Sequence, residues 1–521
     1  MASHLFAAID VGSFELELGI YEISNKNKIK KLDHVRHVIA LGKETYNTGK
    51  ISYEMVEEIC HVLSGFVRIM KSYKVTNYRA YATSAMREAK NSQIVLDQIR
   101  VRTGIEVRII SNSELRFLSY KAIATKDEEF DRNMERRTAI VDVGFGSMQV
   151  SLFESSLLVS TANLPLGILR LRGMLDMMNT TMDQSAEVMG ELVTHELHQY
   201  EKMYLEGQEV KHLIAIGDSI LSLVRYMDDG KSVMRLSREQ FEQIYDRLRK
   251  MSLSQISEEY GISVEYADLL LPSAIIYKKV LEMTGAEMIW IPGIRLCDGI
   301  VAEYATDMKL IKMKHNFDSD IISASRNMAN RYRCKTPHSE QVEIYALKIF
   351  DTMKRYHGMS GRERLLLQIA VIVHACGKFI SVRNTAECSY NIIMSTEIIG
   401  LSHLEREIIA NVLRYNTKEF DYNQVHVETD LANIAGTYGT RKEVTILIAK
   451  LTAILRLADS MDCAHKQTLK NCKMAVKEDM LVVTNDYRRD MMLDVISFEE
   501  KAAFFEEIFG IRPVLKMKRS V

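Results

Sequence analysis

The chain has 521 residues, which is long enough for three or four domains that each bury a core of their own. Its 68 basic and 69 acidic side chains give a formal net charge of -1, which excludes a global attraction to nucleic acid or to an acidic membrane surface. The seven cysteines lie far apart without a CxxC pair, so neither a disulfide framework nor a zinc ribbon is expected.

The first strand-like segment, residues 5–10, follows the initial methionine without the basic and apolar regions of a signal peptide. The most apolar later runs, such as residues 365–373, are about ten residues long and flanked by charge, which is well short of a membrane span. The sequence therefore predicts a cytoplasmic protein that has neither a membrane nor a nucleic acid as partner.

A weak internal repeat is the most informative feature of the N-terminal part. The segment AAIDVGS at residues 7–13 recurs as AIVDVGFGS at residues 139–147. In each copy an apolar strand ends in Asp-x-Gly and a second, alternating strand follows, at residues 16–20 and 149–153. This pattern predicts two β-hairpins with glycine-containing turns, and hence two similar lobes.

Between the two copies, helical stretches alternate with short strands, including residues 78–83 and 106–110. Such alternation is typical of an α/β fold. The charged stretch at residues 126–137, which contains Asp127, has two interpretations: a connection between the lobes or the solvated face of a helix.

From about residue 315 to residue 470, apolar residues recur with the 3.6-residue period of helices, which predicts a mostly helical domain. The tail is expected to form a small α+β segment, with strands at residues 480–483 and 491–495 around a phenylalanine-rich helix. The predicted boundaries are 1–131 and 132–308 for the two lobes, 309–470 for the helical domain and 471–521 for the C-terminal segment.

An Asp-x-Gly-Ser turn suits phosphate, because glycine lets the backbone approach closely and both amides and the hydroxyl donate to oxygen. The aspartate can hold Mg²⁺ or a water molecule, so Asp10 and Asp142 are the predicted metal ligands. One such turn is usually structural, but two at matching strand ends predict a cleft for a polyanion. The predicted phosphate-binding residues of these turns are Asp10, Gly12, Ser13, Asp142, Gly144, Gly146 and Ser147.

Three further segments carry a family resemblance. Residues 82–91 read ATSAMREAKN, residues 166–171 read LGILRL and residues 292–299 read PGIRLCDG. Together with the two turns, they resemble motifs of the exopolyphosphatase/guanosine pentaphosphate phosphohydrolase (Ppx/GppA) family, namely ATSALRDAKN, LGxVRL and GLREG, in order along nearly the whole chain. The resemblance implies an α/β fold with two actin-like (ribonuclease H-like, ASKHA) lobes, followed by a mostly helical HD-like domain.

The resemblance also implies site residues. It places Arg87 in the cleft, where a guanidinium can bind phosphate oxygens bidentately; the alternative is an exposed arginine near a helix start. It places a catalytic glutamate motif at residues 110–117, where Glu114 is the carboxylate present, and a later phosphate loop at Gly217 and Ser219. The implied substrates are inorganic polyphosphate or guanosine penta- or tetraphosphate, the implied cofactor is Mg²⁺, and a homodimer is expected.

The chain departs from the family pattern in ways that bear on chemistry. Where the family motif ISGxEEAR has its second glutamate, the water-activating base, this chain has Leu115, which cannot accept a proton. Gln149 occupies the place of a carboxylate linked to metal and water, which weakens the site for Mg²⁺. Glu114 could substitute, but neighbouring side chains on an extended segment point to opposite sides. The loops depart at Phe14, which replaces an asparagine, and at Phe145, which replaces a glycine.

The helical domain shows a parallel pattern. His338, His374 and Asp459 occupy places that match an HD metal site, which needs histidines and aspartates from several helices. The aspartate expected after the second histidine is Ala375, and a later histidine is Cys388. The sequence therefore predicts a degenerate HD site without a bound metal, in which the two histidines are core residues.

Two functions stay open at this level. The first is a phosphatase that hydrolyses terminal phosphoanhydride bonds of inorganic polyphosphate or guanosine pentaphosphate. The second is a catalytically impaired pseudoenzyme that binds polyphosphate, a nucleotide or an alarmone as a sensor, which Leu115 and Gln149 favour. A sugar kinase or actin-like ATPase shares the lobes but is disfavoured, because the arginine segment and the HD-like region match the phosphatase family.

Overall fold

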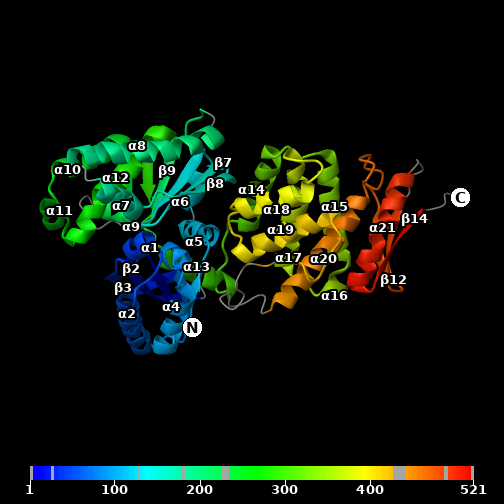
Figure 1. Ribbon diagram of the computed structural model, residues 1–521, viewed down its shortest axis with the longest axis horizontal. Helices are drawn as coiled ribbons and strands as arrows, with labels where there is room; N and C mark the ends of the chain where they lie inside the picture. Colours follow the sequence, from blue (N-terminus) through cyan, green and yellow to red (C-terminus); the bar gives the residue numbers. More distant parts are fainter. Residues whose placement is uncertain are drawn as a thin grey trace. The chain divides into compact units, whose positions relative to one another are not determined.

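The computed structural model describes residues 4–24, 28–126, 128–178, 182–205, 207–224, 234–425, 427, 440–485 and 491–517. The chain forms two compact units, residues 1–316 and residues 317–521. The first unit contains two lobes, which Figure 1 shows in blue for the first and mainly in cyan and green for the second.

Lobe I contains β1 (His4–Val11), β2 (Glu15–Ser24), β3 (Lys28–Val38), α1 (Leu41–Thr48), α2 (Tyr53–Ser72), β4 (Asn77–Ala82), α3 (Ser84–Glu88), α4 (Ser92–Thr103), β5 (Val107–Ile109) and α5 (Asn112–Ala124), and also α13 (Leu296–Asp307) from later in the chain. Its five strands form one sheet in the order β3-β2-β1-β4-β5. β1, β2 and β3 are antiparallel, whereas β4 and β5 run parallel to β1.

Both faces of this sheet are covered by helices. Ala7 and Ile9 of β1 lie in a core with α2 and α4, whereas Phe6 and Ala8 lie in a second core with α5 and α13. The alternation follows from the strand geometry, since successive side chains point to opposite faces. α13 follows the last strand of lobe II but packs on lobe I, so the chain crosses between the lobes a second time.

The helix α6 (Glu128–Met134) forms within the charged stretch and precedes lobe II; Asp127 lies outside the described residues. Lobe II contains β6 (Thr138–Val143), β7 (Met148–Glu154), β8 (Leu157–Leu164), α7 (Ile168–Met178), α8 (Met182–Tyr200), η1 (Glu201–Leu205), β9 (His212–Ile216), α9 (Asp218–Val224), β10 (Met234–Ser237), α10 (Arg238–Lys250), α11 (Leu253–Tyr260), α12 (Val264–Thr284) and β11 (Met288–Ile291). Its six strands lie in the order β10-β11-β9-β6-β7-β8.

The two sheets repeat one topology. In lobe II, β6, β7 and β8 form an antiparallel meander and β9 and β11 run parallel to β6, as β4 and β5 do to β1 in lobe I. The predicted hairpins at both Asp-x-Gly turns are therefore confirmed. The two Asp-x-Gly turns therefore occupy equivalent positions in the two sheets.

The second unit contains α14 (Phe317–Arg331), α15 (Pro337–Thr352), α16 (Lys354–His357), α17 (Gly361–Val373), η3 (Cys376–Phe379), α18 (Thr385–Ser395), α19 (His403–Thr417), α20 (Arg441–Ser460), β12 (Lys473–Lys477), β13 (Met480–Asn485), α21 (Met492–Phe509) and β14 (Arg512–Met517). Helix starts follow capping residues: Thr336 caps α15, which has Pro337 in its first turn, and Thr440 caps α20. The helical character predicted for this region is confirmed.

The tail corrects one expectation. β13 matches the predicted strand at residues 480–483, but the strand predicted at residues 491–495 is wrong, because α21 begins there. The apolar alternation was misleading: Leu493 is exposed, and Asp494 is the buried residue, accepting hydrogen bonds from the Ala464 amide (2.9 Å) and the Thr468 hydroxyl (2.9 Å). β14 completes a sheet in the order β12-β13-β14.

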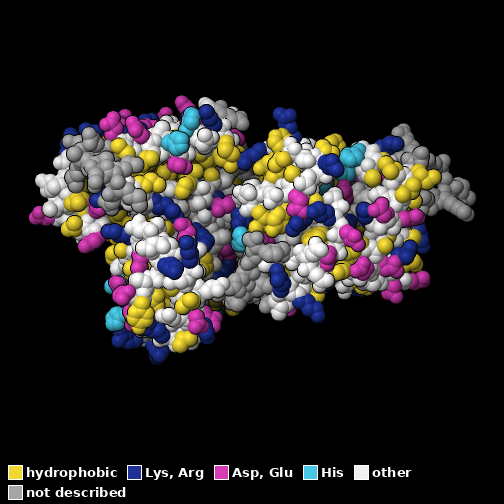
Figure 2. Space-filling model, viewed as in Figure 1, with side chains coloured by type: hydrophobic (Ala, Val, Ile, Leu, Met, Phe, Trp, Pro, Cys, Tyr) yellow, Lys and Arg dark blue, Asp and Glu magenta, His cyan; other side chains and the backbone are white. Residues whose placement is uncertain are grey.

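The surface carries charges of both signs. Figure 2 shows Lys and Arg side chains interspersed with Asp and Glu over the face in view, which agrees with the formal net charge of -1. None of the helices that the structure describes has the length and the apolar content needed to cross a membrane.

Candidate active site

The two predicted phosphate loops are closed by the same backbone hydrogen bond. In the first turn, the Gly12 amide donates to the Glu15 carbonyl (3.0 Å), and in the second, the Gly144 amide donates to the Ser147 carbonyl (3.0 Å). A Cβ at Gly12 would lie 2.8 Å from the Glu15 carbonyl oxygen, so the close approach requires glycine. The two turns therefore share one geometry, although their sequences differ.

The strand registers reveal a relationship that the sequence repeat hides. Asp10 lies opposite Glu17 in the first hairpin, and Asp142 lies opposite Gln149 in the second. Glu17 is thus the counterpart in lobe I of Gln149 in lobe II. The carboxylate that the family resemblance expects at position 149 is missing, but the equivalent position across the cleft carries one.

Both turns line one cavity of about 110 Å³ in the first unit, together with residues at the starts of α3, α5 and α9. We refer to it as the inter-lobe cleft. Of the predicted site residues, those lining it are Asp10, Gly12, Ser13, Arg87, Asp142, Gly144, Gly146, Ser147, Gly217 and Ser219. Glu114 is not among the lining residues, whereas its neighbour Leu115 is.

Glu114 belongs to a helix cap. Residues 112–124 form α5, so the expectation of an extended segment around Glu114 is wrong. Its carboxylate accepts a hydrogen bond from the Ser111 amide (2.9 Å) and pairs with the Arg108 guanidinium, while the Ser111 hydroxyl accepts from the Glu114 amide (3.2 Å). This reciprocal capping box fixes the start of α5 and turns Leu115 toward the cleft.

Arg87 lies at the end of α3 and is half-buried. Its Nη1 donates to the Ile110 carbonyl (2.7 Å) and its Nη2 donates to the Asn112 side-chain carbonyl. Both acceptors are uncharged oxygen atoms that orient the guanidinium group. The side chain is held at the cleft wall by the segment that leads into α5.

Two of the three predicted phosphate-binding serines, Ser13 and Ser219, form hydrogen bonds within the protein. The Ser13 hydroxyl lies 2.9 Å from the Tyr46 hydroxyl and 3.0 Å from the Ser84 hydroxyl, and Ser13 is only 4% exposed. The Ser219 hydroxyl donates to the Val143 carbonyl (2.6 Å), which ties the start of α9 to the second turn. These hydroxyls hold the cleft walls in place, so phosphate contacts would come chiefly from backbone amides.

Phe14 and Phe145, the two aromatic residues that depart from the family pattern, contact each other. The rings of Phe14 and Phe145 are tilted, with centroids 4.9 Å apart, and Tyr266 of α12 lies edge-on to both. Phe14 is buried in the hydrophobic core of lobe II, although it belongs to the turn of lobe I. An apolar contact therefore joins the tips of the two phosphate loops.

Five carboxylates line the inter-lobe cleft: Asp10, Glu15, Glu17, Asp142 and Asp218. Burial, reinforced by Glu17, holds the pKa of Asp10 well above its usual range. Burial and Asp218 raise the pKa of Glu15 and of Glu17 to about 8 and that of Asp142 to about 7. The cleft is thus strongly acidic and partly protonated at neutral pH.

Basic side chains compensate part of this charge. Arg295 pairs with Asp218, and its Nε lies 3.7 Å from Glu17 Oε1. Arg36 Nη1 lies 3.4 Å from Glu15 Oε2. Sequence reasoning missed these five residues, although one signal was present: Glu15 and Glu17 lie in a strand that is otherwise largely apolar and buried on both faces.

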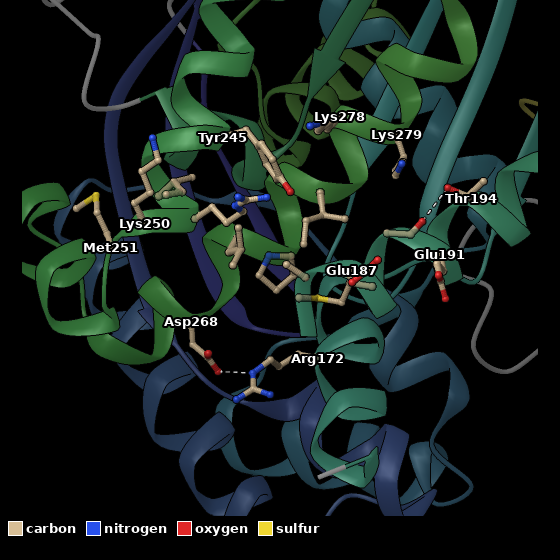
Figure 3. Close-up of a pocket in the computed structure, with 18 of the residues that line it drawn as sticks. Arg172, Glu187, Glu191, Thr194, Tyr245, Lys250, Met251, Asp268, Lys278 and Lys279 are labelled. Carbon is tan, nitrogen blue, oxygen red and sulfur yellow. Dashed lines mark hydrogen bonds and ion pairs between the residues drawn. The ribbon is translucent and has the colours of Figure 1, made fainter. Parts of the chain in front are cut away.

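A larger cavity, about 1520 Å³, lies on lobe II between α7, α8, α10, α11 and α12, away from all predicted site residues (Figure 3). Charged side chains of both signs line it and pair locally: Arg172 pairs with Asp268 (2.7 Å, Figure 3), and Lys279 pairs with Glu282 (2.7 Å). Size alone does not identify a site. The smaller cleft, where buried charges converge, is the better candidate for chemistry.

In the second unit, the predicted degenerate HD residues come together. Ligand atoms of His338, His374 and Asp459 lie within 4.8 Å of one another. His338 contacts Asp459 through Nε2 (3.0 Å) and Asp462 through Nδ1 (2.9 Å). Burial opposes charge on His338, but its bonds to Asp459 and Asp462 outweigh burial and raise its pKa, whereas burial lowers the pKa of His374.

Comparison with known proteins places these features in a family. Residues 20–307 match the model of the Ppx/GppA phosphatase family, and residues 322–498 match that of Ppx/GppA phosphatase domain III. Guanosine-5'-triphosphate,3'-diphosphate pyrophosphatase of Photobacterium profundum is 22% identical over 419 residues, which cover 79% of this chain and 80% of that protein. Exopolyphosphatase 1 of Mycobacterium tuberculosis is 21% identical over 343 residues, or 63% of this chain and 98% of that protein.

Solved structures support the fold. The Ppx/GppA family member of Aquifex aeolicus has a TM-score of 0.50 at 20% identity, and an exopolyphosphatase from Cytophaga hutchinsonii has 0.52 at 19% identity. Each match covers 60% of this chain and 100% of the other. The predicted class, two actin-like α/β lobes with a helical C-terminal part, is confirmed; the HD-like description stays a prediction. Since a single family model spans more than half of its residues, this chain belongs to the Ppx/GppA phosphatase family.

Proposed function

We propose that this protein hydrolyses terminal phosphoanhydride bonds of inorganic polyphosphate or of guanosine pentaphosphate. The observation that carries the proposal is the convergence of two equivalent Asp-x-Gly turns and Arg87 on one cleft. Family membership supports it, because curated relatives bear the names exopolyphosphatase and guanosine-5'-triphosphate,3'-diphosphate pyrophosphatase.

Phosphatases of this family generally depend on a metal ion. The residues present fit a divalent cation, because Asp10 Oδ1 is buried in the cleft and accepts no hydrogen bond from any residue that the structure describes. We propose that Asp10 and Asp142 contact Mg²⁺, which would neutralise charge on a bound phosphate. Gln149, beside Asp142, contributes no charge to that ion.

The chain's own residues supply the remaining chemistry. Arg87 would orient the terminal phosphate and stabilise the charge that grows on the transferred phosphoryl group, as would the amides of the two turns. A water molecule would attack in line with the leaving oxygen. Because Leu115 occupies the cleft wall where the resemblance expects a base, we expect hydrolysis to be slow.

A second candidate function is a pseudoenzyme that binds polyphosphate, a nucleotide or an alarmone as a sensor. It is favoured by the capping box that holds Glu114 at its own helix start, which leaves that motif without a carboxylate in the cleft. Under either function we propose a cytoplasmic homodimer.

One pair of measurements on the same preparation tests the two functions. Phosphate release from long-chain polyphosphate and from guanosine pentaphosphate is followed with Mg²⁺, beside calorimetric binding of each compound. Binding with slow release supports the hydrolase, and binding without release supports the sensor. If neither compound binds at millimolar concentration, both proposals fail.

A further inference from the structure

Three carboxylates gather where the lobes face each other. Ligand oxygens of Glu15 and Glu17 in β2 and of Asp218 at the start of α9 lie within 4.8 Å of one another. Glu15 and Glu17 are two residues apart on one strand, so their side chains point to the same face. Two oxygens on opposite sides of one divalent cation are about 4.2 to 5.2 Å apart, so this spacing suits a single ion.

Two buried carboxylate oxygen atoms nearby accept no hydrogen bond from any residue that the structure describes. Glu17 is 2% exposed and lines the cleft. Its Oε2 lies 3.2 Å from His34 Nε2, whereas its Oε1 accepts no hydrogen bond from any described residue and lies 3.7 Å from Arg295 Nε. Asp10 lies opposite Glu17 in the hairpin, outside the three-carboxylate group, and its Oδ1 has no hydrogen-bond partner among the described residues either. Unsatisfied buried carboxylate oxygens are costly and point to a missing positive ligand.

The overall charge of the cleft gives the same indication. Its described lining contains five carboxylic acid side chains and two guanidinium groups, those of Arg87 and Arg295, and Arg36 approaches Glu15 from outside the lining. A divalent cation bound to these carboxylates would add positive charge that a phosphate chain could approach.

We propose that Glu15, Glu17 and Asp218 bind a divalent cation of the Mg²⁺ class between the lobes, at a position distinct from the Asp10–Asp142 pair. The ligands are all oxygen atoms, which hard cations such as Mg²⁺ and Mn²⁺ prefer over soft metals. Its use as a partner for a phosphate chain rests on the proposed function; its existence as a binding site does not.

The proposed site also bears on Gln149, which stands where the family resemblance expects a carboxylate. Gln149 removes a carboxylate from the second hairpin, and Glu17 supplies one at the equivalent position of the first. The carboxylate at this position of the hairpin is therefore present in lobe I and absent from lobe II. Because Asp218 comes from lobe II, the ion would link the two lobes.

Mn²⁺ binding to the full chain, without any phosphate compound, tests the inference by electron paramagnetic resonance and equilibrium dialysis. The expected result is a Mn²⁺ site whose affinity falls at least about tenfold in Glu15→Gln and in Glu17→Gln, in addition to any Mn²⁺ held by Asp10 and Asp142. Glu22→Gln, on the same strand but not part of the cleft lining, is the matched control and should bind as the wild type does. Gln keeps the shape of Glu, and circular dichroism checks that each variant is folded.

Asp142→Asn separates this inference from the proposed function. If Asp142→Asn abolishes Mn²⁺ binding while Glu15→Gln and Glu17→Gln retain it, the ion sits at the Asp10–Asp142 pair and the inference is overturned, although hydrolysis could still occur. No Mn²⁺ binding by the wild type at millimolar concentration overturns it too. An anomalous scattering peak from Mn²⁺ in a crystal, located between Glu17 and Asp218, would establish the site even if one variant failed to fold.

Discussion

The Phe14 ring packs on the Phe145 ring, with centroids 4.9 Å apart, so that the tips of the two phosphate loops touch through apolar surface. These are the two loop positions where the family resemblance leads one to expect an asparagine and a glycine. Tyr266 extends the contact into the core of lobe II. The pair therefore occupies space beside the cleft that small or polar residues would leave to a ligand.

Replacing Phe145 with alanine should raise affinity for polyphosphate while lowering stability. The ring pair contributes about 0.5 to 1.5 kcal/mol beyond its buried area, and its loss opens the cleft mouth. Calorimetric titration with polyphosphate and thermal unfolding measure the two effects. Phe145→Leu, which keeps most of the bulk, is the control and should destabilise without improving binding. An unchanged affinity in Phe145→Ala would show that the ring does not obstruct the ligand.

Arg87 should contribute directly to anion affinity. A charge-assisted contact to phosphate is worth about 1.5 to 3 kcal/mol, so Arg87→Ala should weaken polyphosphate binding roughly 10- to 100-fold. Arg87→Lys should recover only part of the loss, because an ammonium group lacks the fork that now spans the Ile110 carbonyl and Asn112. Arg100→Ala, an exposed arginine of α4 paired with Asp97, serves as the control. Equal affinity in Arg87→Ala and the wild type would remove Arg87 from the site.

The internal repeat was readable from sequence because hairpin turns depend on local residues, and the strand registers confirm both hairpins. The sequence similarity suggests that Ser13 corresponds to Ser147. In the structure, the closing bonds align Ser147 with Glu15 instead, because Gly12 and Gly144 each donate to the third residue after them. The similar residue patterns locate the two turns, but they do not show which residues of the two turns are structurally equivalent.

The acidic cluster could not be predicted in the same way. Glu15 and Glu17 approach Asp218 only because α9 of lobe II faces β2 of lobe I, a relationship between segments about 200 residues apart in the chain. The expectation for Glu114 fails for a local reason. The Ser-x-x-Glu pattern of Ser111 and Glu114 forms a capping box at a helix start, whereas the sequence analysis expects an extended segment there.

The acidic cleft should make stability depend on pH. Glu15 and Glu17 have folded-state pKa values of about 8, above the ordinary value of 4.5, so the folded state binds more protons than the unfolded state between these values. Stability from these groups is therefore lost as pH rises from about 5 to 8. Thermal unfolding in chelator should show a smaller loss over this range in Glu17→Gln than in the wild type. Parallel curves for the two proteins would contradict the raised pKa of Glu17.

The group of His338, His374 and Asp459 should hold no metal ion. His338 has a carboxylate at each ring nitrogen, and Ala375 and Cys388 stand where two further ligands of an HD site are expected. The remaining residues offer too few donors to hold a metal ion tightly. Elemental analysis of protein purified without chelator should find far less than one metal per chain at this site, and stoichiometric metal removed by His338→Gln would contradict the prediction.

The contacts of His338 with Asp459 and Asp462 also predict that the stability of the fold decreases on the alkaline side. A histidine whose folded pKa is raised above 6.5 contributes stability that is complete below that value and is lost as pH rises through the folded pKa. Thermal unfolding should therefore show a decline on the alkaline side that His338→Gln lacks. Glu15→Gln, which alters only the cleft, should keep this decline.

Restoring two carboxylates should raise the rate of hydrolysis. Leu115→Glu would place a proton acceptor on the cleft wall, and Gln149→Glu would add charge beside Asp142. General-base catalysis supplies roughly 10²- to 10⁴-fold in rate, so the double variant should release phosphate from polyphosphate at least about tenfold faster than the wild type. Steady-state phosphate release with Mg²⁺ measures this, and binding should change little, because the backbone of both turns is untouched.

The control for this gain is Leu115→Gln with Gln149 unchanged, which adds a polar side chain of the same length without a base. If that variant gains as much as the double variant, polarity rather than proton transfer limits the reaction. The gain should be larger when Phe145→Ala is added, because the aromatic contact at the loop tips then no longer competes for space with the terminal phosphate. Rapid turnover by the wild type, left unchanged by Glu114→Gln, would show that a group other than residue 114 or 115 already activates water. The expectation of slow hydrolysis and the sensor proposal would then both be wrong.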